Sequence, residues 1–114
     1  MRGIDEFEQL SQLVIKWAED RKIIPNSNPQ AQLLKTLSEL GELADATLKL
    51  DTDEVVDGIG DVLVTLILFA ELYNHANSKE IDLTGCLRVA YKTIKDRKGT
   101  LTPEGIFVKE AEAP

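Results

Sequence analysis

One apolar segment limits the fold of this chain more than any other feature. Residues from about Asp53 to Tyr73 are predicted to form a helix, and after Asp61 its side chains are apolar on nearly every side: Val62, Leu63, Val64, Leu66, Ile67, Leu68 and Phe69. A helix that is apolar all round is buried all round. In a chain of only 114 residues, we therefore expect this helix to contribute to a subunit interface as well as to an internal core.

Three further helices are predicted from the spacing of apolar residues. The first covers about residues 4–21, and its expected core stripe is Phe7, Leu10, Val14 and Trp17. The second begins at Asn28 and Pro29, the residue types of an N-cap and a first helical position. It runs to about Leu48, and its expected core stripe is Leu33, Leu37, Leu40 and Ala44. The fourth is capped by Asp82 and runs to about Lys98, where Gly99 is expected to end it.

Together these helices predict an all-α protein. The short connection at residues 50–53 makes the second and third helices antiparallel neighbours. We expect a four-helix bundle that forms one domain over residues 1–99. Pro103 and Gly105 prevent the helix from continuing, so residues 100–114 are expected to form an irregular C-terminal tail.

The composition excludes several classes of function. A net charge of −7 disfavours binding to nucleic-acid polymers and anionic membranes, because like charges repel. The longest apolar stretch, residues 62–70, is shorter than the ~20 residues of a membrane span. The single cysteine, Cys86, cannot form an internal disulfide, and residues 1–6 lack the apolar region of a secretory signal. We therefore expect a cytoplasmic protein.

Two pairs of acidic residues lie on the second and third predicted helices, with mostly apolar or glycine residues beside them. Glu39 and Glu42 are three residues apart, and Asp57 and Asp61 are four apart, so each pair shares one helix face. Unpaired carboxylates on an apolar face are costly to desolvate, and carboxylates that project from facing helices are typical of metal sites in bundles. The pattern favours Mg²⁺, with Mn²⁺ as a substitute. For either pair alone, the alternative is a solvated acidic face.

Glycines and basic residues add to this pattern. Gly41, Gly58 and Gly60 lie mid-helix beside the acids, at a cost of roughly 1 kcal/mol each, which is tolerated where backbones approach closely or a ligand needs room. From Arg88 to Lys98 there are five basic side chains and one acidic one. Such a segment suits a polyphosphate held between metal and cations. Alternatively, these bases only complement the helix dipole.

The acidic segments resemble a known family. Leu37–Ala46 followed by Asp57–Leu63 is similar to the E-x-x-E, spacer, E-x-x-D pattern of the all-α nucleoside triphosphate pyrophosphohydrolases of the MazG-like group. The similarity extends from Trp17 to about Lys109, and Ile94–Gly99 resembles the short, single-domain members. The resemblance implies a homodimer, or dimer of dimers, that uses Mg²⁺ to hydrolyse a (d)NTP to (d)NMP and pyrophosphate, in cleansing or control of the nucleotide pool.

The resemblance also implies roles for individual residues. By position, Glu39, Glu42 and Asp61 match metal ligands, and Glu39 or Glu42 would orient or deprotonate the attacking water. Lys35 matches a position suited to substrate phosphate. The further expected substrate contacts are the basic residues of the C-terminal segment and one aromatic residue: Lys95, Arg97, Lys98 and Trp17.

One position departs from the family pattern. Gly58 stands where the pattern has its third carboxylate, three residues before Asp61. We expect Asp57 to substitute as a ligand, with Glu54 as the second candidate. Two other functions remain open: phosphoribosyl-ATP pyrophosphohydrolase, and a non-catalytic helical dimerisation or regulatory module whose metal site has decayed.

Four other polar residues are not assigned to the site. His75 is expected to be a surface or cap residue, and Cys86 a buried structural thiol among apolar neighbours. Asn74 and Asn77 stay open between a base contact and a helix cap.

Overall fold

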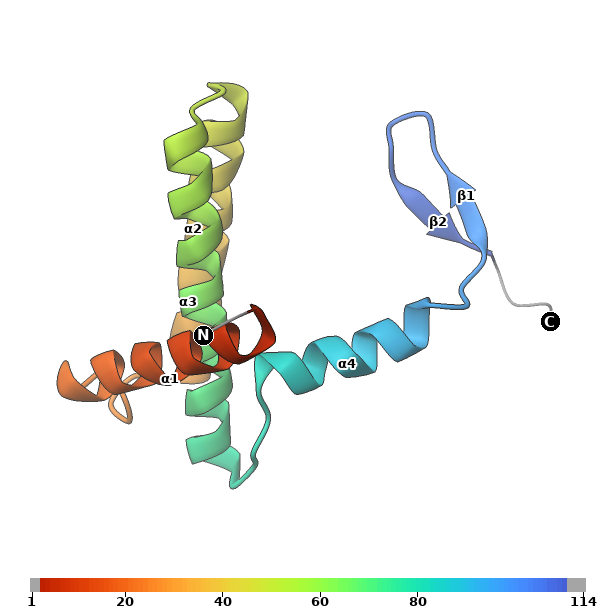
Figure 1. The fold of residues 1–114 in the computed structure, drawn as a ribbon. Helices are drawn as coiled ribbons and strands as arrows, with labels where there is room; N and C mark the ends of the chain where they lie inside the picture. The colour runs from red at the N-terminus through yellow and green to blue at the C-terminus, as the bar shows by residue number, and fades with distance from the viewer. Residues whose placement is uncertain (1–2, 111–114) are drawn as a thin grey trace. The chain divides into compact units, whose positions relative to one another are not determined.

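Four helices form most of the chain and confirm the all-α class. The structure, a computed structural model, describes the backbone of residues 3–110 and the side chains of residues 6–110. The helices are α1 (Gly3–Asp20), α2 (Pro29–Leu48), α3 (Thr52–Asn77) and α4 (Leu83–Ile94) (Figure 1). The chain divides into two compact units, Met1–Leu83 and Thr84–Pro114, and each is described by itself. Within the described part, no helix is long and apolar enough to cross a lipid bilayer.

Local capping signals define the ends of α2 and α3. The Asn28 side chain accepts a hydrogen bond of 2.8 Å from the Ala31 N–H, and Pro29 is the first helical residue, as the sequence predicts. Asp51 caps α3 in the same way, through the Glu54 N–H at 3.1 Å. At its other end, α3 runs past the predicted limit at Tyr73 and stops at Ser78, which adopts the left-handed conformation with φ 54°.

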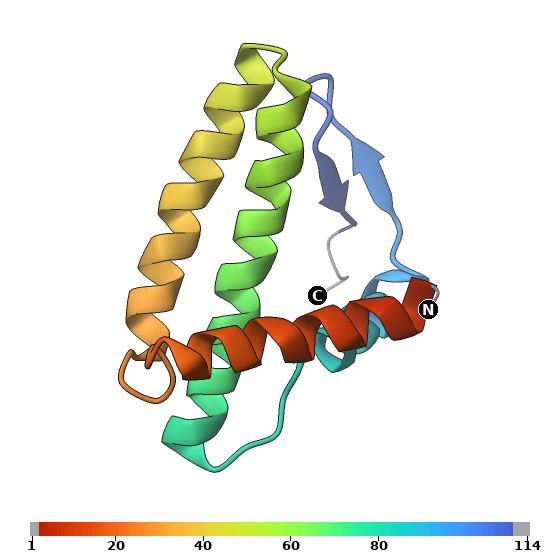
Figure 2. The same ribbon diagram turned by 60° about the vertical axis from the view of Figure 1, so that its left-hand side comes forward.

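In the first unit, α2 and α3 pack side by side and α1 crosses α3 (Figure 2). The short connection after Leu48 makes α2 and α3 antiparallel, as predicted. The core cluster joins the end of α1 to the second half of α3 and consists of Ala18, Ile24, Leu68 and Leu72, with Val14, Ile15, Ile23 and Val64 packed against it. This cluster fixes α1 on α3.

The buried faces of α1 and α2 differ from the predicted core stripes. On α1, Leu10 and Trp17 are 53% and 43% exposed, whereas Phe7 and Val14 of the predicted stripe are partly buried, and Ala18, outside the stripe, is buried. On α2, the predicted stripe is exposed along its whole length: Leu33, Leu37, Leu40 and Ala44. The residues of α2 that are buried are Thr36, Glu39 and Ala46. Thus the polar stripe of α2 that contains Thr36 and Glu39 faces α3, and the leucine stripe lies on the outer surface of the protomer.

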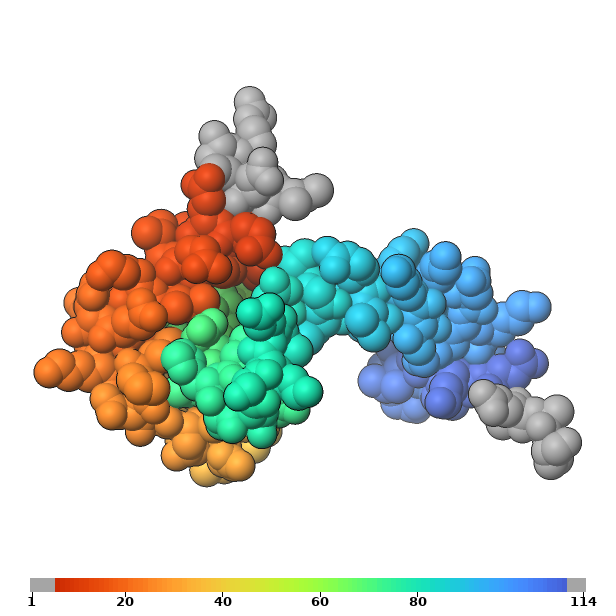
Figure 3. All heavy atoms as spheres, turned by 90° about the horizontal axis from the view of Figure 1, so that it is seen from below, coloured from red at the N-terminus to blue at the C-terminus, as the bar shows by residue number. Residues whose placement is uncertain are grey.

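The end of α3 and the loop after it are held against each other by Asn74. Its side-chain amide donates to the Ile81 carbonyl at 2.8 Å, and its side-chain oxygen accepts from the Ile81 N–H at 2.9 Å. A hollow of about 430 Å³ lies between this loop, α1 and α3, on the face seen in Figure 3. His75 is exposed beside Glu71, with Nε2 3.6 Å from Oε1, which agrees with the predicted surface position. Asn77 donates to the Tyr73 carbonyl within α3.

The second unit contains a β-hairpin where the sequence predicts an irregular tail. Strands β1 (Gly99–Leu101) and β2 (Phe107–Lys109) pair antiparallel, with Thr100 opposite Val108. The prediction fails because Gly105, with φ 91°, belongs to a tight turn in which the Thr102 N–H donates to the Ile106 carbonyl at 2.8 Å. Gly99 therefore opens a strand and is not a helix cap.

Helix α4 is shorter and more exposed than predicted. It ends at Ile94, before the predicted limit at Lys98. None of its residues, all of which the structure describes, is buried. Cys86 is consequently exposed, which corrects the expectation of a buried structural thiol.

Candidate metal and nucleotide site

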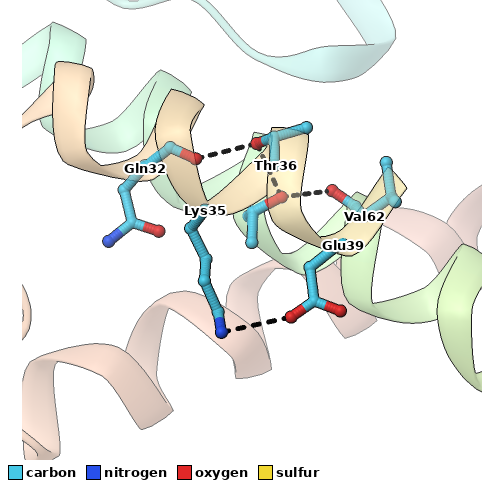
Figure 4. A network of polar contacts seen from close by, with 6 residues as sticks. Gln32, Lys35, Thr36, Glu39 and Val62 are labelled. Atoms are coloured by element: carbon cyan, nitrogen blue, oxygen red, sulfur yellow. Dashed lines mark hydrogen bonds and ion pairs between the residues drawn. The ribbon is translucent and has the colours of Figure 1, made fainter. Parts of the chain in front are cut away.

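Two contacts between α2 and α3 define the register of the helices, and so determine which acidic residues face each other. The Thr36 and Thr65 hydroxyls are 2.8 Å apart across the interface. Further along the pair, a Cβ placed on Gly58 would lie 3.1 Å from Leu43 Cδ1. Because the helices are antiparallel, both contacts define the same register, and Glu39 and Asp61 fall between them in sequence. Figure 4 shows Glu39 one turn from the Thr36 contact.

The acids line one hollow. Its volume is about 580 Å³, and its lining residues are Glu39, Glu42, Asp45, Lys49, Glu54, Asp57, Gly58 and Asp61. The structure therefore brings together the four predicted metal ligands and the second candidate, Glu54. Asp45 and Lys49 were not predicted from the sequence. Asp45 lies three residues after Glu42, so extending the acidic spacing by one step would have found it.

Glu39 is the acidic residue with the least exposure to solvent. It is 7% exposed and is one of three buried polar residues in the described part of the chain. Its Oε1 lies 3.2 Å from the Nζ of Lys35, one turn earlier on α2, and the lysine side chain is 60% exposed. Lys35 thus partly neutralises Glu39 while its amine stays accessible from solvent.

The surroundings of the hollow raise the pKa values of two carboxylates, Glu42 and Asp61. A hydrogen bond with Glu39 and the charge of that carboxylate raise the pKa of Glu42, to which burial and Asp61 add. The pKa of Asp61 is raised first by burial and then by the charges of Asp57 and Glu39. The nearby Lys35 lowers both values without removing the effect. Negative charge is therefore in excess here, and a bound cation would relieve it.

The donor chemistry of the hollow fits Mg²⁺. All the candidate ligands are carboxylate oxygens, which are hard donors, and the mutual repulsion just described is the electrostatic environment that a divalent cation stabilises. Within residues 6–110, however, no three acidic, histidine or cysteine side chains already converge at metal-binding distance. The residues fit the ion, and their side chains would have to rotate toward it.

Gly58 is the mid-helix glycine that lies against the facing helix. It is buried, and an added Cβ would press on Leu43 from 3.1 Å. Gly41 and Gly60 differ, because a Cβ at either position would meet nothing within 4 Å. Of the three glycines expected to allow close approach or leave room for a ligand, only Gly58 lies at a close helix contact.

The predicted substrate contacts lie in both units. Trp17 is on α1, with the Arg21 guanidinium 5.1 Å from its ring centroid. In the second unit, Arg97 and Lys98 line a hollow of about 550 Å³ whose other residues are Lys92, Thr93, Asp96, Lys109 and Glu110. Lys95 is not among them. The roles of Trp17 and of the three C-terminal bases in substrate binding stay predictions.

Comparison with known proteins identifies the family. Residues 27–101, more than half of the chain, match the MazG nucleotide pyrophosphohydrolase domain. The chain belongs to this family. The match contains every residue of the acidic hollow and leaves out Trp17. The resemblance read from the acidic motifs is thus confirmed.

One curated relative and the solved structures were also compared with this MazG domain. Over 73 residues it is 37% identical to an uncharacterised 18.2 kDa protein from the rep-hol intergenic region of Haemophilus phage HP1 (strain HP1c1). The aligned part covers 64% of the chain but 44% of that relative, so the chain spans less than half of the relative's length. No solved structure matches.

Proposed function

We propose that this MazG domain is a Mg²⁺-dependent nucleotide pyrophosphohydrolase that cleaves (d)NTP to (d)NMP and pyrophosphate. The observation that carries the proposal is the hollow in which Glu39, Glu42, Asp57 and Asp61 meet between α2 and α3. Membership of the MazG family supports the reaction class. Cleansing or control of a cytoplasmic nucleotide pool is the role that fits this reaction.

The roles of the acidic residues follow from their surroundings. Asp57 and Asp61 on α3, with Glu39 on α2, would hold the ion, which supplies Lewis-acid activation of the phosphate and a more acidic water. Glu42 would act as the general base, because a hydrogen bond with Glu39 and the charge of that carboxylate raise its pKa. A base with a raised pKa holds an abstracted proton more firmly than an ordinary carboxylate does.

The basic residues would hold the substrate phosphates. The Lys35 amine is exposed beside Glu39, so it is available to a phosphate oxygen next to the acidic hollow. Lys95, Arg97 and Lys98 supply further positive charge for the leaving pyrophosphate. Trp17 offers an exposed aromatic ring for a base.

The same proposal includes a homo-oligomer, either a homodimer or a dimer of dimers. The outer face of α2 exposes Leu33, Leu37 and Leu40, and the neighbouring helix α3 exposes Val56, Ile59 and Leu63. An apolar surface that covers two adjacent helices is a typical subunit interface. A second copy of the chain bound at this surface would bury the leucine stripe of α2, which is exposed in the protomer.

The second candidate function is a non-catalytic regulatory module. Two observations favour it: Gly58 replaces a family carboxylate, and the described acids are not already gathered at metal-binding distance. Phosphoribosyl-ATP pyrophosphohydrolase shares the proposed chemistry and differs in substrate. A substrate panel separates all three functions.

The deciding experiment is pyrophosphate release from canonical and modified (d)NTPs and phosphoribosyl-ATP, with and without Mg²⁺. We expect Mg²⁺-dependent release that falls on the order of 10²-fold or more in Glu42→Ala, because a general base contributes that much. Asp53→Asn is the matched control, since Asp53 is an exposed acid of α3 outside the hollow. Absence of release from every compound by a folded protein would favour the regulatory module.

A further inference from the structure

Two buried threonine hydroxyls lie next to the acidic hollow. Thr36 on α2 and Thr65 on α3 are 7% and 5% exposed, and apart from Glu39 they are the buried polar residues of the described chain. A hydroxyl buried without a hydrogen bond costs on the order of 1–3 kcal/mol. Valine has nearly the same shape and carries no such cost, so the presence of threonine at both positions calls for a reason.

The two hydroxyls form one hydrogen-bonded chain across the helix interface (Figure 4). Thr36 Oγ1 lies 2.8 Å from Thr65 Oγ1 and 2.8 Å from the Gln32 carbonyl oxygen, and Thr65 Oγ1 lies 2.8 Å from the Val62 carbonyl oxygen. Two hydroxyl protons serve these three contacts, so one of the three is unmade at any time. In two of the three arrangements, one threonine donates to the other and the second donates to its own helix, which keeps the bond between the helices. In the third, both hydroxyls donate to their own helices, which leaves two hydroxyl oxygens 2.8 Å apart with no proton between them, so the close distance favours the first two.

The Thr36–Thr65 bond resists sliding of α2 along α3, and it lies close to the acidic residues of the site. Thr36 precedes Glu39 by three residues, and Thr65 follows Asp61 by four. In an antiparallel pair, the threonines therefore lie one turn beyond the acids on both helices. On the other side of the acids, Leu43 and Gly58 make an apolar contact, which limits the distance between the helices but has no directional preference along them.

The spacing of the acids is sensitive to helix sliding. A slip of α2 along α3 by one residue moves the carboxylates of one helix by about 1.5 Å relative to those of the other. Mg²⁺ demands near-ideal octahedral geometry with oxygen distances of about 2.0–2.1 Å. A shift of that size therefore separates ligands that one ion must hold together.

We infer that Thr36 and Thr65 are positioning residues that fix α2 along α3, so that the Glu39–Glu42 pair and the Asp57–Asp61 pair face one Mg²⁺ ion. The inference rests on the proposed function, since it names what holds that site in register. It assigns the threonines no contact with substrate. Their effect reaches the metal through the relative placement of two helices.

The test measures Mg²⁺ affinity by calorimetry without nucleotide, together with thermal unfolding. Thr36→Val removes the hydroxyl at nearly constant shape, and Thr65 still has its bond to the Val62 carbonyl. We expect about 10-fold weaker Mg²⁺ binding, the loss typical when support of metal ligands is removed. Thr36→Ser keeps the hydroxyl and should restore affinity to within about threefold of wild type. The double variant Thr36→Val/Thr65→Val leaves no unpaired hydroxyl and should bind Mg²⁺ about as weakly as Thr36→Val, because both lack the bond between the helices.

Thr47→Val is the matched control. Thr47 is an exposed residue of α2 whose hydroxyl bonds only within the helix, to the Leu43 carbonyl at 2.9 Å, so its loss should leave Mg²⁺ affinity unchanged. If Thr36→Val and the double variant fold less stably but bind Mg²⁺ like wild type, the threonines are structural and the inference is wrong. If wild type itself neither binds Mg²⁺ nor releases pyrophosphate, the proposed function is wrong. The inference rests on that function and is then wrong as well.

Discussion

Gly58 of α3 packs against Leu43 of α2 so closely that a Cβ on the glycine would lie 3.1 Å from Leu43 Cδ1 and 3.3 Å from Leu43 Cβ. Contacts this tight require the neighbouring side chain to move by a few tenths of an ångström. The position at which the chain departs from the family's acidic pattern is therefore also the closest approach of a described mid-helix glycine to the facing helix. Gly58 therefore lacks the carboxylate of the family pattern and also lies at a close contact between the two helices.

This contact predicts different effects for two glycine substitutions in α3. Gly60→Ala should raise the free energy of unfolding by about 0.5–1 kcal/mol, because alanine favours the helix and its methyl group meets nothing within 4 Å. Gly58→Ala should lack this gain, because the new methyl group presses on Leu43. Urea denaturation of both variants measures the difference. Equal stabilisation by the two substitutions would show that Leu43 yields without cost.

A second prediction concerns Lys35, which lies 3.2 Å from Glu39 and is exposed on its other side. Lys35→Met should strengthen Mg²⁺ binding in the absence of nucleotide by about 2–10-fold, because it removes a positive charge next to a proposed ligand. The same variant should raise the KM for nucleotide, because a phosphate contact is lost. Calorimetry and pyrophosphate release measure the two opposite effects.

The control for this prediction is Lys16→Met. Lys16 also pairs with an acid one turn away, Asp20 at 2.7 Å, and both side chains are more than half exposed on α1. Removal of its charge should change neither Mg²⁺ affinity nor KM. If Lys35→Met behaves like this control, Lys35 has no role at the site.

Local signals predicted the fold better than periodicity predicted the buried faces. Asn28 and Pro29 gave the start of α2 correctly, since a cap depends on its own few residues. The buried face of α2 was predicted wrongly, because the helix carries a leucine stripe and a polar stripe, and spacing alone does not say which one meets α3. Thr36 is buried and Leu37 is 65% exposed, an arrangement that only tertiary packing determines.

The same distinction applies to the site. The acidic hollow was predictable because Glu39 and Glu42, like Asp57 and Asp61, share a face by spacing alone. The Thr36–Thr65 bond was not, because it depends on the register between two helices. The hairpin was missed because Gly105 was interpreted as a residue that ends structure, whereas its φ of 91° allows the turn between two strands.

The raised pKa values of the acidic hollow predict a dependence of stability on pH. Glu39, by hydrogen bond and charge, raises the pKa of Glu42, and burial followed by the charge of Asp57 raises that of Asp61. Below the ordinary carboxyl pKa of about 4, both groups are protonated in folded and unfolded chains. As the pH rises through this value toward the raised ones, the unfolded chain loses its protons first, so the metal-free protein becomes less stable.

Glu42→Gln isolates this effect, because glutamine cannot lose a proton. In EDTA, the melting temperature of Glu42→Gln minus that of wild type should increase as the pH is raised from about 4 to 7, above the ordinary carboxyl range. Saturating Mg²⁺ should reverse the sign near pH 7, since a ligand that binds the folded state stabilises it and the variant lacks one carboxylate. A difference that is independent of pH would contradict the raised pKa of Glu42.

The outer faces of α2 and α3 predict how the chain associates. Leu37 is 65% exposed on α2, and Val56 is 66% exposed on α3, so both are available for burial by a second copy. Leu37→Glu should dissociate the oligomer, because a charge buried without a partner at an interface costs several kcal/mol. Sedimentation velocity of wild type and variant measures the change in mass. Leu50→Glu is the matched control, since Leu50 is 86% exposed in the connection between α2 and α3. A wild-type protein that sediments as a monomer at micromolar concentration would contradict the proposed interface, and so would a Leu37→Glu variant that keeps the mass of the wild-type oligomer.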